Sequence, residues 1–243
     1  MFNILIVDDN IFYAKKLVNI IGDKVQNTRI FNVATTGFEA INILQNNNID
    51  IVLLDLKIPK MNGVEILNSL SEEQLDKYEK SIILVSGDSE LIVKARNNRA
   101  VYGYVIKGSG TDNLILQINE IIKEKKDMII EKDILKKIVN EVQFLGYNLS
   151  HKGTTYLIET IYYILTNQNK NYDNLSKSVY PILSKKYNKS ISNIKVNISK
   201  ASDIMYYECE KNKLNKYFRF YLDCKPKPKN IINTIATKIK FKN

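Results

Sequence analysis

Several residue types are scarce in this chain, and each scarcity excludes a class of protein. The two cysteines, Cys209 and Cys224, fit no metal-site spacing, so we expect reduced thiols in a cytoplasmic protein. The single histidine, His151, excludes most imidazole-based metal and acid–base sites and is expected at the surface or at a helix cap. No apolar run reaches the ~18 residues of a membrane span, and no secretion signal precedes the first strand, so we expect no membrane partner.

The composition is that of a soluble globular protein, and 243 residues are enough for two domains. Its charge is unevenly placed: residues 1–125 contain 14 Lys+Arg and 16 Asp+Glu, whereas residues 126–243 contain 22 and 10. An acidic first half is therefore followed by a second half of charge +12 that suits a polyanion. A generally lysine-rich composition is the alternative, but it does not explain why the excess lies in one half.

Polar side chains follow four apolar, strand-like runs in the first 107 residues. These are Asp8 and Asp9 after residues 4–7, Asp55 after 51–54, Ser86 after 82–85, and Lys107 after 105–106. Because ligands bind at the carboxyl ends of parallel strands, these groups should converge on one edge of a sheet. Three neighbouring carboxylates repel one another unless a divalent cation and a lysine neutralise them. This combination suits the capture of a phosphoryl group on a carboxylate.

On these residues, the first half resembles the receiver domain of two-component response regulators. The resemblance implies that Asp55 is the phospho-acceptor, that Ser86 and Tyr104 are the switch residues, and that Lys107 pairs with the phosphate. It also implies a Mg²⁺ cofactor held by Asp9, Asp55 and the backbone carbonyl of Lys57, with Asp8 acting through water. The segment 59–63 resembles the family's proline-to-glycine loop. The alternative, in which the three acids only cap helices, leaves Lys107 and Ser86 unexplained.

Two departures from the receiver pattern bear on the site. Gly108 follows the lysine where many receivers have proline, which predicts a less rigid loop. Lys57 and Asp88 lie two residues beyond Asp55 and Ser86 and flank the path of the hydrolytic water in receivers. One hypothesis is that the two bridge across the site and prolong the phosphorylated state. The alternative is two solvated charges whose pairing contributes little.

The fold class expected for residues 1–125 is an α/β receiver domain with a doubly wound, five-stranded parallel sheet. The receiver resemblance implies the strand order 2-1-3-4-5. The expected strands cover residues 3–7, 29–33, 50–54, 81–85 and 101–105, and the expected helices 11–22, 36–46, 63–69, 89–98 and 111–125. Residues 126–137 lack proline, glycine and serine, so a short helical linker is expected there, either continuing the last receiver helix or pausing briefly.

Residues 138–243 predict an all-α domain with a helix-turn-helix. The helices expected in the second half cover residues 130–145, 153–167, 173–187, 191–210 and 229–241, with a kink or break at Val179-Tyr180 before Pro181. A turn at 188–190 leads into a helix whose buried stripe would be Ile194, Ile198 and Met205. The candidate DNA-contacting residues on and before this helix are Lys189, Ser192, Asn193, Lys195, Val196, Asn197, Ser199 and Lys200.

Residues 138–241 also resemble the DNA-binding domain of the master regulators of endospore formation in Firmicutes. The matching segments are 151–153, 156–157, 180–181, 184–188 and 224–228. This family binds DNA as a tandem dimer after phosphorylation, but its recognition helix is rich in arginine, and residues 188–200 contain none. We therefore expect Asn193 and Asn197 to read adenine, and Lys189, Lys195 and Lys200 to contact phosphates. The stretch 225–229 is either a further phosphate contact or a solvated loop.

The function expected from these patterns is a phosphorylation-controlled transcription factor rather than an enzyme. Its expected partners are a sensor histidine kinase or phosphotransfer protein, double-stranded DNA, and a second copy that binds on phosphorylation through the face around residues 89–122. The alternative is a receiver-controlled interaction regulator whose helical domain no longer binds specific DNA. An output enzyme finds little support, because the second half lacks a glycine-rich phosphate loop, a metal cluster and a nucleophile–base pair.

Overall fold

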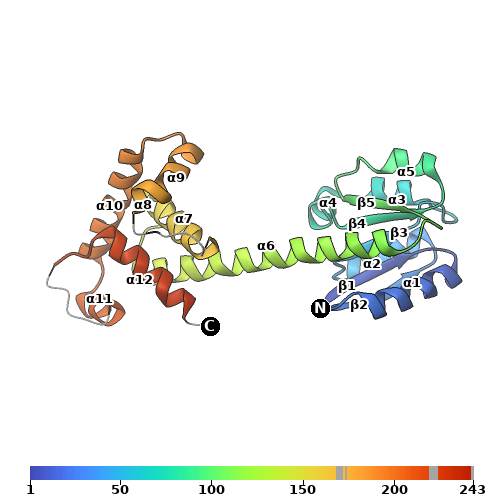
Figure 1. Ribbon diagram of the computed structural model, residues 1–243, viewed down its shortest axis with the longest axis horizontal. Coiled ribbons are helices and arrows are strands. Elements are labelled where there is room, and N and C mark those ends of the chain that lie inside the picture. The colour runs from blue at the N-terminus through green and yellow to red at the C-terminus, as the bar shows by residue number, and fades with distance from the viewer. Residues whose placement is uncertain (168–171, 173, 219–223, 242–243) are drawn as a thin grey trace. The chain divides into compact units, whose positions relative to one another are not determined.

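A computed structural model describes residues 1–167, 172, 174–218 and 224–241. These residues divide into two compact units, Met1–Asp127 and Met128–Asn243 (Figure 1). The domain boundaries expected from the sequence stay a prediction.

The first unit contains a five-stranded, all-parallel sheet. Its strands are β1 (Phe2–Val7), β2 (Thr28–Ala34), β3 (Ile51–Leu54), β4 (Ile82–Ser86) and β5 (Val101–Ile106). They lie in the order β2-β1-β3-β4-β5, which confirms the expected topology. The central strands β1, β3 and β4 are almost entirely buried, because helices cover both faces of the sheet. Their unbroken apolar runs follow from this burial.

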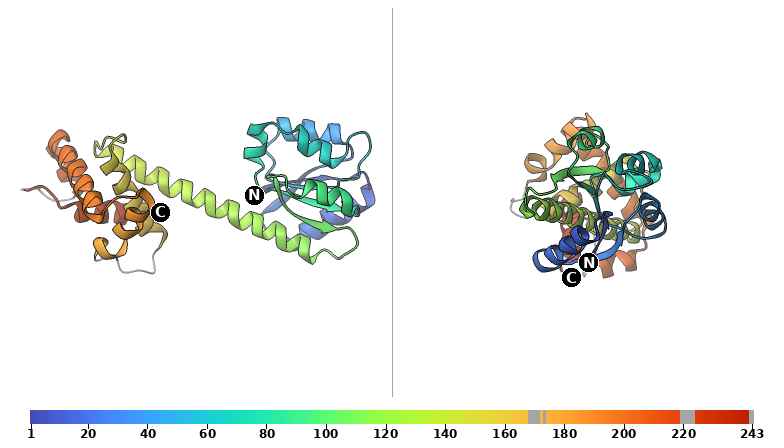
Figure 2. Two further views of the ribbon diagram at one scale, coloured as in Figure 1. Left: turned by 90° about the horizontal axis from the view of Figure 1, so that it is seen from above. Right: turned by 90° about the vertical axis from the view of Figure 1, so that its right-hand side faces the viewer.

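The helices of the first unit form two layers, one on each face of the sheet (Figures 1 and 2). One layer comprises α1 (Ile11–Lys24) and the beginning of α6 (Asp112–Phe144), and it shares a core with Ile4, Ile6 and Ile83. The other comprises α2 (Gly37–Asn46), α3 (Gly63–Ser69) and α5 (Ser89–Ala95), packed on Leu5 and Leu54. Helix α5 is shorter than the expected 89–98, since it ends at Ala95 with Arg96 as its cap.

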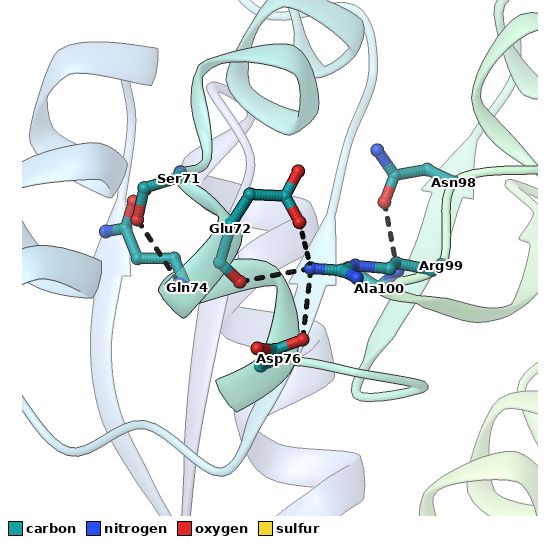
Figure 3. A network of polar contacts seen from close by, with 7 residues as sticks. All are labelled: Ser71, Glu72, Gln74, Asp76, Asn98, Arg99 and Ala100. Atoms are coloured by element: carbon teal, nitrogen blue, oxygen red, sulfur yellow. Dashed lines mark hydrogen bonds and ion pairs between the residues drawn. The ribbon is translucent and has the colours of Figure 1, made fainter.

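One further helix, α4 (Glu72–Lys77), was not predicted from the sequence. None of its residues is buried, so no apolar period marks it. Polar contacts hold it instead: Ser71 and Gln74 form a reciprocal capping box at its start. The Arg99 guanidinium lies 2.8 Å from Glu72 and 3.1 Å from Asp76, and it also donates to the Glu72 carbonyl (Figure 3). Arg99 thereby joins α4 to the turn before β5.

Helix α6 is continuous from Asp112 to Phe144 and passes through the boundary between the units. The sequence left open whether a helix would continue or pause after residue 125, and the helix continues. Residues 123–137 contain no proline or glycine to interrupt the backbone hydrogen bonds. An ion pair between Lys137 and Asp133, one turn apart, adds local support.

The second unit is helical in its described residues. After α6 come α7 (Lys152–Thr166), α8 (Leu175–Ser178), α9 (Tyr180–Tyr187), α10 (Ile191–Glu208), α11 (Lys211–Phe218) and α12 (Pro228–Lys240). The break expected at Val179-Tyr180 is confirmed, and Pro181 lies in the first turn of α9, where its missing N–H costs nothing. Residue 173, the start of the expected helix 173–187, lies outside the described residues. Helix α11 was not predicted, since five of its eight residues are lysine or asparagine.

Helices α7 and α10 approach each other closely at Gly153. A Cβ atom at this position would lie 2.0 Å from the carbonyl oxygen of Asn197 and 2.9 Å from the Ala201 side chain. Only glycine therefore permits the two backbones to pass at this distance. The contact fixes α10 from its buried side, where Ile194, Ile198 and Met205 join the core of the unit.

Candidate functional site

Three carboxylates meet at the carboxyl ends of β1 and β3. Asp8 and Asp9 follow β1, and Asp55 follows β3; one carboxylate oxygen from each lies within 4.8 Å of the others. Asp8 and Asp55 are buried residues, with 2% and 4% of their surface exposed, whereas Asp9 faces solvent. Backbone hydrogen bonds from Asp8 to Ala34 and from Asp55 to Val7 hold both residues in register with the sheet.

Lys107 brings a positive charge into this cluster from the end of β5. Its Nζ lies 2.6 Å from Asp55 Oδ2 and 2.7 Å from Asp8 Oδ2, and its backbone N–H donates to the Ser86 carbonyl at 3.1 Å. Burial lowers the pKa of Lys107, but the hydrogen bonds to Asp55 and Asp8 outweigh it and raise the pKa above its ordinary value. The lysine therefore stays charged and bridges two buried carboxylates.

Asp8 is the acid that burial affects most clearly. Desolvation raises its pKa, while the hydrogen bonds from Lys107 and from the Asn10 backbone act in the opposite direction. The neighbouring Asp55 carboxylate raises the pKa further. The cluster thus carries more negative charge than Lys107 alone neutralises.

The chemistry of this cluster fits a small divalent cation. The donor set consists of carboxylate oxygens, which Mg²⁺ prefers, and the single ammonium leaves net negative charge among them. The exposed Asp9 leaves one side open to solvent, as a cation that keeps several waters requires. Lys57 lies next to this set, with its backbone N–H donating to Asp55 Oδ1 at 3.1 Å.

A cavity of about 680 Å³ adjoins Asp55. Its lining consists of Asp55, Lys57, Ser86, Gly87, Asp88, Ser89, Glu90 and Lys107. Ser86 is fully buried, and its Oγ accepts a hydrogen bond from the Asp88 N–H at 3.4 Å. The Asp88 carboxylate caps α5 by accepting from the Glu90 and Leu91 N–H groups. Among the described residues, no ion pair joins Asp88 to Lys57, although the two line the same cavity.

Tyr104 and Gly108 lie on either side of Lys107 in the sequence and do not take part in the carboxylate cluster. The Tyr104 side chain is 44% exposed, so the structure does not bring its ring into the buried cluster with Ser86. Gly108 has φ +97°, in the left-handed region that proline cannot adopt. The turn after Lys107 is therefore built for glycine, which accounts for the absence of the proline that many receivers have there.

Sequence reasoning missed one aromatic residue at this site. The ring of Tyr13, in the first turn of α1, has the Lys107 Nζ 4.8 Å from its centroid. Burial raises the pKa of the Tyr13 hydroxyl. The positive charge of Lys107 lowers this pKa, and the negative charges of Asp8 and Asp55 raise it. No local pattern in the sequence pairs Tyr13 with Lys107, because the two residues are far apart along the chain.

The candidate DNA-contacting residues lie around the start of α10. Asn188, in the left-handed conformation, ends α9, and Ser190 caps α10 by accepting from the Asn193 N–H. The structure exposes Lys189, Ser192, Asn193, Lys195, Val196 and Lys200, and it half-buries Asn197 and Ser199. The Asn197 amide donates to the Asn193 carbonyl and side-chain oxygens, at 2.8 and 3.1 Å. The two asparagines thus form one polar unit.

The other residues singled out in this unit lie at the starts of helices or form an ion pair. His151 occupies the cap position of α7, but its side chain makes no capping hydrogen bond. Lys225 forms an ion pair with Asp203 on α10, and Pro228 begins α12. Residues 225–228 thus serve to connect and start a helix, and whether they also contact phosphates stays a prediction.

Comparison with known families matches both units. Residues 4–119 match the response regulator receiver domain, and residues 138–239 match the C-terminal domain of the sporulation initiation factor Spo0A. No helix among the described residues combines the length and the apolar character needed to cross a lipid bilayer.

The individual proteins that resemble this chain have low sequence identity to it. The transcriptional regulatory protein YdfI of Bacillus subtilis is 28% identical over 146 residues, which cover 59% of this chain and 64% of that protein. The chain thus spans less than two thirds of this curated relative. A CheY-like receiver domain from Methanospirillum hungatei is 24% identical with a TM-score of 0.44, covering 52% of this chain and 98% of the other. TrrA from Thermotoga maritima, solved with Mg²⁺ and BeF, is 26% identical with a TM-score of 0.42, covering 50% and 99%.

Proposed function

Because the chain belongs to the response regulators, with a receiver domain and a Spo0A-type C-terminal domain, we propose that it is a transcription regulator switched by phosphorylation of Asp55. The observation that carries this proposal is the Lys107 ammonium held 2.6 Å from the Asp55 carboxylate beside an open cavity. The phosphoryl donor would be a histidine of a sensor kinase or of a phosphotransfer protein.

The proposed transfer uses Asp55 as the nucleophile. An Asp55 oxygen forms a bond to phosphorus while the phosphorus–nitrogen bond of the phosphohistidine breaks, and the imidazole nitrogen keeps the electron pair and takes up a proton. Lys107 then pairs with a phosphoryl oxygen in place of the carboxylate oxygen, and so neutralises charge on the transferred group. Asp8, Asp9 and Asp55, with the Lys57 carbonyl, would hold Mg²⁺, which supplies further charge neutralisation.

The proposed response begins at Ser86. Its buried hydroxyl lines the cavity beside Asp55 and would donate to a phosphoryl oxygen there. Tyr104, exposed in the structure, would change position with it and alter the surface around residues 89–122. Pairing of two copies through that surface would raise their affinity for paired DNA sites by effective concentration.

Double-stranded DNA is the proposed target of α10. The exposed Lys189, Lys195 and Lys200 support contacts to phosphates, and the second half carries the positive charge of the chain. Asn193 and Asn197 would present their amides to adenine in the major groove. Because residues 188–200 contain no arginine, we propose a different operator from that of the sporulation regulators.

The experiment that tests this function is a selection from a random DNA pool with the full chain, with and without the phosphoryl mimic beryllofluoride. We expect a sequence motif that the mimic enriches and that Asp55→Ala fails to enrich under the same conditions. Mass spectrometry of the intact chain after treatment with acetyl phosphate, with Asp55→Ala as the control, tests the phosphorylation itself.

A second candidate is an interaction regulator whose helical domain captures a protein instead of DNA. The recognition helix without arginine favours it. Recovery of no DNA motif, with only weak and salt-sensitive binding, would support this candidate over the first.

A further inference from the structure

The surroundings of Lys107 contain one group that the proposed chemistry leaves without a role. Two sides of the ammonium face the carboxylates of Asp55 and Asp8, at 2.6 and 2.7 Å. A third side faces the ring of Tyr13, 4.8 Å away at the centroid. Tyr13 lies on α1 and Lys107 directly follows β5, two elements that are far apart in the sequence.

We propose that Tyr13 is a positioning residue for Lys107 in the phosphoryl transfer, an inference that rests on the proposed function. An aromatic face attracts a cation without accepting a proton and without competing for the phosphoryl group. The ring also covers one side of the ammonium, whose side chain is only 22% exposed. Tyr13 thus limits where the lysine can go when its bond to Asp55 is exchanged.

The exchange explains why a neutral partner is useful. Before transfer, Asp55 and Asp8 both hold the ammonium, so it has little freedom. As the Asp55 oxygen becomes bonded to phosphorus, the carboxylate loses its negative charge and its hold on the lysine weakens. The acid Asp8 and the ring of Tyr13 then remain to keep the ammonium beside the incoming phosphoryl oxygens. A long, flexible lysine side chain without such support has many rotamers in solvent.

The direct test is structural and needs no phosphorylation. In proton NMR, a methylene group above an aromatic ring is shifted upfield. We expect the Lys107 ε-methylene protons to be shifted upfield in the wild-type chain and in Tyr13→Phe, and to return to the ordinary position in Tyr13→Leu. Phe12→Leu is the matched control, because Phe12 lies on the same helix but is 88% exposed. An ordinary shift in the wild type would overturn the proposal.

The functional test follows phosphorylation of the full chain by acetyl phosphate. In this reaction an Asp55 oxygen bonds to phosphorus, and acetate leaves with the electron pair of the broken phosphorus–oxygen bond. We expect Tyr13→Leu to lower the rate constant for phosphorylation of Asp55 about 5-fold, which corresponds to the free energy of a partly buried cation–π contact. Tyr13→Phe should react at a rate within about twofold of the wild type, because it keeps the aromatic ring. In a Lys107→Ala background, Tyr13→Leu should have no further effect, because the two residues act together.

The outcomes separate this inference from the function beneath it. If the wild-type chain gains no phosphoryl group on Asp55, the proposed function falls and the inference falls with it. If the wild type is phosphorylated and Tyr13→Leu reacts at the same rate, only the inference falls. An equal effect of Tyr13→Leu with and without Lys107 would likewise overturn it, since the ring would then act through something other than the ammonium.

Discussion

Asp8 and Asp55 are buried acids on neighbouring strands, and a single lysine is shared between them. Such a cluster stores unfavourable free energy in the folded chain, because desolvation and mutual repulsion both penalise the ionised carboxylates. Burial accordingly raises the pKa of the Asp8 carboxyl above its ordinary value. The site is therefore prepared for positive charge and less stable without it.

Asp8→Asn should stabilise the receiver unit at neutral pH, because it removes the buried charge that raises the pKa of Asp8 and keeps an acceptor for the Asn10 N–H. Since the folded pKa of Asp8 lies above its ordinary value of 3.8, the wild type loses stability as pH rises from 3.8 through the folded pKa. The difference in unfolding free energy between Asp8→Asn and the wild type should therefore be absent below pH 3.8, and it should be constant above the folded pKa of Asp8. Urea unfolding of the full chain between pH 3 and 8 measures this, and a variant less stable at pH 7 would contradict it.

Lys57 and Asp88 border the cavity through which water would reach a phosphoryl group on Asp55. If they bridge across the phosphorylated site, Lys57→Asn should shorten the phosphoryl lifetime about 2- to 5-fold, the range of an exposed ion pair. Asp88→Asn should do the same, since asparagine keeps the cap of α5 and removes only the charge. Decay of the phosphorylated chain, followed by mass spectrometry, gives both lifetimes. Lifetimes equal to that of the wild type would leave the two as solvated charges.

At the scale of elements, the sequence reveals the parts that have an apolar period and misses the parts that do not. The strands of the sheet and the buried stripe of α10 are marked by buried apolar residues such as Ile51, Leu84 and Ile198. The observed strand order confirms the predicted topology. Helix α4 buries nothing and depends on Arg99, 22 residues beyond its end at Lys77, a contact that no local pattern contains. The same holds for Tyr13, whose role follows from a distance across the fold.

The exposed residues of α10 should have two different effects on DNA binding, one from phosphate contacts and one from base contacts. Lys195→Ala and Lys200→Ala should each weaken DNA binding for all sequences and reduce the salt slope by about 1, as expected for a phosphate contact. Asn193→Ala should cost about 1–3 kcal/mol on the selected motif and relax its sequence at one position. Binding titrations at several salt concentrations distinguish the two, with Lys211→Ala on α11 as the control. If Asn193→Ala changed the salt slope and the two lysine variants did not, Asn193 would be the phosphate contact instead of the lysines.

The close passage of α7 and α10 at Gly153 gives a sharper prediction for stability. Gly153→Ala places a methyl group against the Asn197 carbonyl, so the helices must separate, at a cost of about 1–3 kcal/mol. Gly22→Ala is the matched control, because nothing lies within 4 Å of a Cβ there. Thermal unfolding should show the loss in the second unit, while phosphorylation of Asp55 stays unchanged. An unchanged unfolding temperature of the second unit would mean that its stability does not depend on the close contact at Gly153.

For the whole molecule, the two halves differ in sign, −2 for residues 1–125 and +12 for residues 126–243. Mutual repulsion of the basic halves opposes the pairing of two copies in the absence of DNA. Under the proposed pairing the receiver supplies the attraction, and its surface around residues 89–122 exposes apolar side chains. These are Val93, Tyr104, Ile106 and Leu116.

Leu116→Glu should keep the chain monomeric in the presence of beryllofluoride, because it places a charge on the surface proposed for pairing. Phosphorylation of Asp55 should be unaffected, since Leu116 lies outside the cluster. Phe38→Glu is the control: Phe38 is also exposed but lies on α2, outside residues 89–122. Sedimentation velocity reports the monomer and dimer. A wild type that stays monomeric with the mimic would argue against pairing through the receiver.

The division of α10 into an inner and an outer side has an evolutionary consequence. Ile194, Ile198 and Met205 anchor the helix in the core, while Asn193, Lys195 and Lys200 face outward and contribute little to that packing. Substitutions on the outer side therefore carry a small stability penalty. Under the proposed function, a lineage could exchange one set of target genes for another, one mutation at a time, while inheriting the same scaffold and the same phosphoryl switch.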